Sequence, residues 1–120
     1  MYSVSVRSHF SSAHNLRGYK GKCEDVHGHN WNVELVARSE TLDRTGMVAD
    51  FKDLKRILKQ CLEELDHKNL NDLEYFSKVN PTSENIARYV HEKVSGMAEG
   101  LDISKVTVWE TDTSSATYSV

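Results

Sequence analysis

The chain is poor in cysteine and proline and has no long apolar run, and each shortage excludes a class of protein. Its 120 residues include two cysteines and one proline. Two cysteines are too few for a disulfide framework, so we expect a reducing, cytoplasmic compartment. No apolar stretch is long enough to cross a bilayer and no signal peptide is visible at the start, so we expect no membrane partner.

The chain also lacks a large excess of either positive or negative charge. The chain has 15 basic and 18 acidic residues, a formal net charge of -3. Because no strongly basic face is implied, we expect no nucleic-acid partner. The length and the 38% of hydrophobic residues suit one domain over residues 1–120 with one modest core.

Hydrophobic periodicity predicts four strands and two helices. Alternation predicts strands over residues 2–12 and 28–39, with later strands beginning near residues 106 and 116. Helical spacing predicts one helix over 51–65, capped by Asp50, and a second capped by Thr82 and ending near residues 96–100. Residues 17–22 and 70–78 are expected to be loops. Two strands, two helices and two strands predict an α+β fold, with both helices on one face of an antiparallel sheet.

Two histidines, His27 and His29, stand one residue apart where the second strand begins. Alternate side chains of a strand share a face, so both imidazoles are expected on the apolar face. His14 reaches the same end of that face if the first strand continues without a bulge. Three neutral imidazoles with an open position are typical of catalytic zinc. The alternative is that each histidine is only structural or solvated, as we expect for His9 and His91.

Four further segments each have a functional and a structural interpretation. Cys23 is either an ordinary loop thiol or a base made reactive by a nearby cation. Asp66 and His67 either end a helix or form a carboxylate–imidazole pair for proton transfer. Glu110 has the parity of an apolar strand face, where a carboxylate needs a partner, either a basic side chain or a ligand. The acidic first turn at residues 82–84 is explained by helix capping unless a ligand is placed there.

Together these pieces resemble the 6-pyruvoyl-tetrahydropterin synthase family over nearly the whole chain. The resemblance depends on the order and spacing of several motifs. They are Phe10 to His14, Cys23-x-x-x-His27-Gly28-His29, Met47 to Phe51, Leu65-Asp66-His67, Asn80-Pro81-Thr82-Ser83-Glu84, and Glu110-Thr111 with Ala116. The resemblance implies a tunnelling fold (T-fold), whose subunits join their sheets into barrels. It further implies a homo-hexamer, a dimer of trimers, with active sites between subunits.

The resemblance also implies a role for each candidate residue. The implied zinc ligands are His14, His27 and His29, with Zn2+ as the cofactor. Cys23 is the implied general base, and Asp66 with His67 completes the proton relay. Glu110 is implied to anchor the pterin ring, and the implied neighbouring pocket residues are Thr82, Ser83, Glu84 and Glu24.

The spacing of Cys23 and His27 looks like the bacterial 6-carboxy-tetrahydropterin synthase branch, which serves queuosine biosynthesis. The implied reaction converts 7,8-dihydroneopterin triphosphate to 6-carboxy-5,6,7,8-tetrahydropterin, with release of acetaldehyde and triphosphate. A glutamate at the position of Glu24 resembles a branch that makes 6-hydroxymethyl-dihydropterin for folate. With both Cys23 and Glu24, the chain resembles members suspected of doing both reactions. Formation of the 6-pyruvoyl product, or a non-catalytic zinc- or pterin-binding module, stays open as an alternative.

Overall fold

The computed structural model describes residues 1–21 and 24–120, so Cys23 lies outside the described residues. The sheet contains β1 (Tyr2–His14), β2 (His27–Ser39), β3 (Asp102–Thr111) and β4 (Ser114–Ser119). Each strand pairs antiparallel with the next, so β1 and β4 form the two edges. This confirms the four-stranded antiparallel sheet predicted from the sequence.

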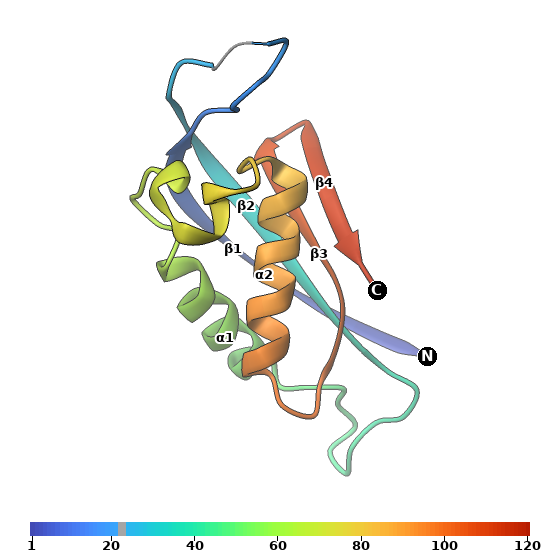
Figure 1. Cartoon of the computed structure of the whole chain (residues 1–120). Coiled ribbons are helices and arrows are strands. Elements are labelled where there is room, and N and C mark those ends of the chain that lie inside the picture. The colour runs from blue at the N-terminus through green and yellow to red at the C-terminus, as the bar shows by residue number, and fades with distance from the viewer. Residues whose placement is uncertain (22–23) are drawn as a thin grey trace.

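Both helices, α1 (Phe51–Glu63) and α2 (Ser83–Met97), cover the same face of the sheet (Figure 1). They are inserted between β2 and β3, which nevertheless lie side by side. The order and the single covered face confirm the α+β class. Over the described residues, no helix has the length and apolar character needed to cross a membrane.

The core lies between this sheet face and the helices. Alternate residues of β1 and β2 are buried there, as expected for a strand with one covered face. The fully buried large side chains include Phe10, Trp31, Val33 and Leu35 from the sheet and Leu54, Leu58, Ile86 and Val90 from the helices. His14, His27 and His29 lie at the end of this apolar face, so their backbone positions are fixed by strands that pack into the core.

Both predicted helix caps are present. Asp50 accepts a hydrogen bond from the Lys52 N–H at 2.8 Å, and Thr82 Oγ1 accepts one from the Asn85 N–H at 3.1 Å. Each cap satisfies an N–H that has no partner inside its own helix and contributes about 1 kcal/mol. The capping interpretation of Thr82 is therefore confirmed.

Apart from shifts of one or two residues at the ends of elements, the structure differs from the sequence-based expectation in residues 70–78 and at the start of β3. Residues 70–78 are not a plain loop, because they contain the short 3₁₀ helices Leu70–Asp72 and Glu74–Ser77. Buried Leu70 and Phe76 anchor these turns, which are too short to show a periodic pattern. β3 begins at Asp102 instead of near residue 106. Its start is hidden in the sequence because the pairing register with β2 shifts between Val36 and Ala37.

Candidate metal centre

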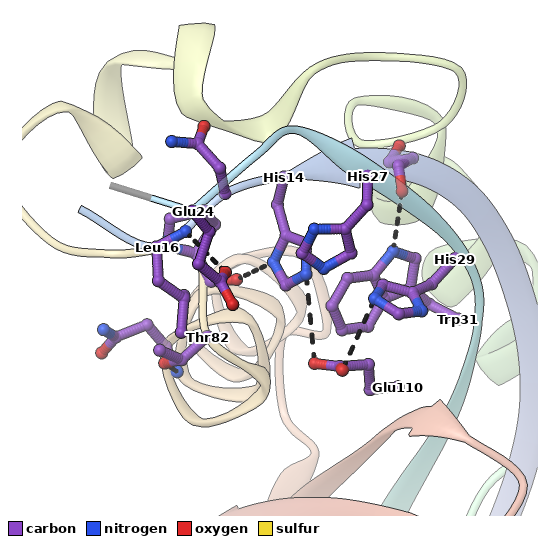
Figure 2. Close-up of polar contacts among 12 residues, drawn as sticks. His14, Leu16, Glu24, His27, His29, Trp31, Thr82 and Glu110 are labelled. Atoms are coloured by element: carbon purple, nitrogen blue, oxygen red, sulfur yellow. Dashed lines mark hydrogen bonds and ion pairs between the residues drawn. The ribbon is translucent and has the colours of Figure 1, made fainter. Parts of the chain in front are cut away.

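Three histidines meet at one end of the sheet, and the pairing of β1 with β2 brings them together. His14 lies directly opposite His27 in the antiparallel register, and His29 lies opposite Ser12. All three rings project to the same side, above Trp31 (Figure 2). The structure therefore groups the predicted ligand residues His14, His27 and His29.

The ring nitrogens of the three histidines converge on a small volume. One ligand atom from each residue lies within 4.8 Å of the other two. The ring centroids are 4.7 Å apart for His14 and His27, 5.2 Å for His14 and His29, and 4.9 Å for His27 and His29. Such spacing suits one ion held by three imidazoles.

Backbone carbonyls fix the orientation of two of the rings. Nδ1 of His14 donates to the Pro81 carbonyl at 2.7 Å, and Nδ1 of His27 donates to the Asp25 carbonyl at 2.9 Å. This leaves the Nε2 lone pair of each ring free, which is the usual outer arrangement of a metal-binding histidine. Neither carbonyl partner, Pro81 or Asp25, could be recognised from the sequence, because a carbonyl partner depends on backbone position and not on residue type.

Among the described residues, two ring nitrogens in the cluster are buried without a hydrogen-bond partner. They are Nε2 of His14 and Nε2 of His29. A buried nitrogen without a partner is unfavourable, and a divalent cation between the rings would satisfy both. The residues present therefore fit the zinc ion that the sequence suggested.

The environment of His14 favours its neutral form. The side chain is 2% exposed, and this burial lowers its pKa below the ordinary value of 6.5. The nearby His27 acts in the same direction, while the hydrogen bond to Pro81 opposes it. A neutral imidazole is the form that binds a metal.

Trp31 forms the floor of the site. Its ring is fully buried and packs edge-on against His14 at 4.9 Å and His29 at 5.2 Å between centroids. The indole N–H donates to the Ser12 carbonyl at 3.2 Å, and the ring stacks on Phe10. His14 and His29 therefore rest on a fixed aromatic surface that continues into the core.

Glu110 reaches the histidines from β3. The register with β4 is irregular between Trp109 and Thr111, so Glu110 sits at a bulge-like position instead of in regular pairing. Its Oε1 lies 3.4 Å from Nε2 of His29 and its Oε2 lies 4.0 Å from Nε2 of His14. The side chain is 36% exposed, so the carboxylate faces both the histidines and solvent (Figure 2).

Glu24 lies beside the same site but is held by the backbone. Its Oε1 accepts a hydrogen bond from the Leu16 N–H at 3.0 Å, and its own N–H donates to the Leu16 carbonyl at 3.0 Å. Thr82 follows Pro81 and uses its hydroxyl to cap α2. Ser83 and Glu84 occupy the first turn of α2, and among the described contacts neither side chain bonds to a histidine of the cluster.

The Asp66–His67 pair forms as predicted in geometry, but no described contact joins it to the three histidines. His67 Nδ1 is 2.8 Å from Asp66 Oδ2, and Asp66 Oδ1 accepts the Ser11 N–H at 2.8 Å. Ser11 is three residues before His14, which corresponds to roughly 10 Å along an extended strand. His67 has a left-handed φ of 55° and is 82% exposed. The pair therefore sits on the outer edge of β1, open to solvent.

These features define a class of protein, an α+β protein whose sheet carries at its end three convergent histidines that fit a metal ion. The family model described as 6-pyruvoyl tetrahydropterin synthase matches residues 3–120. The chain belongs to the 6-pyruvoyl tetrahydropterin synthase family.

Individual relatives agree with this assignment. The chain is 33% identical to the 6-carboxy-5,6,7,8-tetrahydropterin synthase of Haemophilus influenzae over 98% of this chain and 99% of the relative. It is 35% identical to the human 6-pyruvoyl tetrahydrobiopterin synthase over 96% of this chain and 89% of the relative. The solved structure of Caenorhabditis elegans 6-pyruvoyl tetrahydropterin synthase superposes with a TM-score of 0.86 at 31% identity, covering 99% of this chain and 95% of that one. The fold is therefore the T-fold of this family.

Proposed function

We propose that this protein is a zinc-dependent 6-carboxy-5,6,7,8-tetrahydropterin synthase. The substrates are 7,8-dihydroneopterin triphosphate and water, and the other products are acetaldehyde and triphosphate. The observation that carries the proposal is the group of three convergent imidazoles beside the Glu110 carboxylate. The Haemophilus influenzae relative supports the 6-carboxy product, because the similarity extends over nearly the full length of both chains.

In this proposal His14, His27 and His29 hold the zinc ion. When bound, zinc polarises the hydroxyl groups of the substrate side chain and stabilises negative charge that develops on them. Burial favours the neutral form of His14, and neutral imidazole ligands leave the cation its full charge. Trp31 packs edge-on against the rings of His14 and His29 and so supports their orientation.

Glu110 supplies the recognition of the pterin ring. A carboxylate accepts two parallel hydrogen bonds, and the pterin edge offers an amino group and a ring N–H as paired donors. Because Glu110 faces the histidines, a pterin held there has its side chain within reach of the metal centre. Such positioning fixes which substrate carbon meets the reactive groups.

Proton transfer is assigned to Cys23 and to the Asp66–His67 pair. Cys23 lies four residues before His27, and a thiolate next to a cation is a competent base. In the pair, Asp66 accepts from Nδ1 of His67, so Nε2 of that ring is free to exchange protons with a substrate. The pair lies on the edge of β1, so we propose that it serves the site of a neighbouring subunit in a homo-hexamer.

A second candidate is formation of the 6-pyruvoyl product, favoured by the similarity to the human enzyme. Product analysis by mass spectrometry with zinc-loaded protein and 7,8-dihydroneopterin triphosphate separates the two. We expect 6-carboxy-5,6,7,8-tetrahydropterin and acetaldehyde. A 6-pyruvoyl product, or no turnover by protein that retains zinc, would contradict the proposal.

A further inference from the structure

After β1 ends, the backbone of the following residues pairs with side-chain amides instead of with another strand. Asn80 Oδ1 accepts the Arg17 N–H at 2.8 Å, and Asn80 Nδ2 donates to the Arg17 carbonyl at 2.9 Å. Asn71 makes the same pair of hydrogen bonds with the backbone of Asn15, at 2.9 and 2.8 Å. Each side-chain amide therefore pairs with one residue as a strand neighbour would.

Asn80 immediately precedes the residue that orients His14. The Pro81 carbonyl accepts the Nδ1–H of His14 at 2.7 Å. Proline has no N–H, so the peptide that links Asn80 to Pro81 offers no donor, and the peptide that carries the carbonyl donates only through the Thr82 N–H, to the Asn80 carbonyl. Its position depends on the residues on either side.

The link between Asn80 and Arg17 closes a ring of contacts around His14. The ring runs from the His14 backbone through residue 17 to the Asn80 side chain, and from there through Pro81 back to the imidazole. The Asn80 carbonyl is held as well, by the Thr82 N–H at 2.8 Å and Asn85 Nδ2 at 2.9 Å. Asn80 is thus fixed at both its side chain and its backbone.

We propose that Asn80 is a positioning residue for the metal centre. It does not touch the ion. It holds the Pro81 carbonyl at the distance from β1 at which His14 keeps its proton on Nδ1 and presents Nε2 to the cluster. The inference rests on the metal centre of the proposed function and is independent of which pterin product forms.

Asn71 provides a matched control within the same chain. It makes the same two backbone hydrogen bonds, also to a residue just after β1. Its neighbours in the 3₁₀ helix Leu70–Asp72 offer no described carbonyl to a histidine of the cluster. Losing Asn71 therefore removes comparable local bonding without releasing His14.

The test compares Asn80→Ala with Asn71→Ala by competition for zinc with a chromophoric chelator. For Asn80→Ala we expect zinc affinity to fall about 10- to 100-fold, the range found for lost outer partners of metal ligands. For Asn71→Ala we expect the wild-type affinity, with a comparable decrease in melting temperature. Equal loss in both variants, or unchanged affinity in Asn80→Ala, would overturn the proposal.

Two further measurements keep the proposal testable if an alanine variant does not fold or the wild type does not bind zinc. Asn80→Asp and Asn71→Asp each keep the acceptor for the backbone N–H but place a carboxylate oxygen against the backbone carbonyl. Only Asn80→Asp should weaken zinc binding. In metal-free protein, 15N shifts of the His14 ring report the proton position. We expect the Nδ1–H form in the wild type and Asn71→Asp and a tautomer mixture in Asn80→Asp. The same single tautomer in all three would refute the role, whereas absent zinc binding by the wild type would refute only the metal centre.

Discussion

The carboxylate of Glu110 and the imidazole of His29 face each other, with Oε1 3.4 Å from Nε2. The same carboxylate is 4.0 Å from Nε2 of His14. Two roles are compatible with this arrangement, a pterin anchor and a fourth metal ligand. They differ in what the carboxylate binds, so one substitution separates them.

Replacing Glu110 by Gln should weaken substrate binding and leave zinc binding unchanged. The amide keeps the shape of the side chain but cannot accept two hydrogen bonds from the pterin edge. Isothermal titration with substrate or a pterin analogue, together with zinc analysis, measures both effects. Glu34→Gln, on the opposite sheet face where Glu34 pairs with Arg7, is the control. A large loss of zinc from Glu110→Gln would instead make Glu110 a ligand.

Zinc content should be about one ion per chain, as expected for one three-histidine site. His27→Ala or His29→Ala should abolish binding while the fold persists, because both side chains are partly exposed and lie at the end of the sheet. Metal analysis of dialysed protein measures the content, and circular dichroism measures the fold. His9→Ala, a change at an exposed position of β1, should keep its zinc. Full zinc occupancy in the His27 and His29 double variant would contradict the assignment.

Asp66 should stabilise the fold near neutral pH, and this stabilisation should be lost in acid. The Ser11 N–H, and then His67, hold the pKa of this carboxyl below its ordinary value of 3.8. A lowered carboxyl pKa stabilises the fold above the ordinary pKa, and this stabilisation is lost as the pH falls through the lowered pKa. Asp66→Asn should therefore be less stable than wild type near neutral pH, and the difference should shrink below about pH 3.8. Urea midpoints at several pH values measure this, with Asp112→Asn in the exposed β3–β4 turn as the control.

Assembly should occur through the sheet edges. The backbone of Ser11 and Ala13 on the outer edge of β1 is bonded by residues 66–68. Towards residues 3–9 the same edge has no partner among the described hydrogen bonds, and β4 forms the other edge. A free strand edge pairs readily with another strand. We expect a hexamer in light scattering, and a monomer with full activity would refute the interfacial site.

Much of this fold was predictable because its patterns are local. The caps at Asp50 and Thr82, and the shared face of His27 and His29, follow from residue type and strand alternation alone. The limits of β3 were not predictable, because the pairing irregularity at Val36 depends on contacts distant in the sequence.

The surroundings of the candidate site were less predictable than its members. The Pro81 carbonyl that orients His14 is 67 residues away in the sequence, and a carbonyl carries no sequence signal. The position of Asp66 and His67 at the edge of β1 likewise depends on the tertiary structure. The role of Cys23 stays a prediction from spacing, since that residue lies outside the described part of the chain.

Cys23 and Glu24 should support different products. Glu24 is tied to Leu16 through one carboxylate oxygen, whereas Cys23 is proposed to be the base of the 6-carboxy reaction. Cys23→Ala should lose 6-carboxy-5,6,7,8-tetrahydropterin formation by at least about a hundredfold, the lower range for a positioned general base. It should keep its zinc, because the three histidines are unchanged. Any remaining activity should give 6-hydroxymethyl-dihydropterin, and Glu24→Ala should remove it.

Assays of both products from wild type and the two variants test this, with Cys61→Ala as the control, because that buried thiol has its pKa raised to about 12 and stays protonated. If Cys23→Ala forms the 6-carboxy product at the wild-type rate, the general base is another residue.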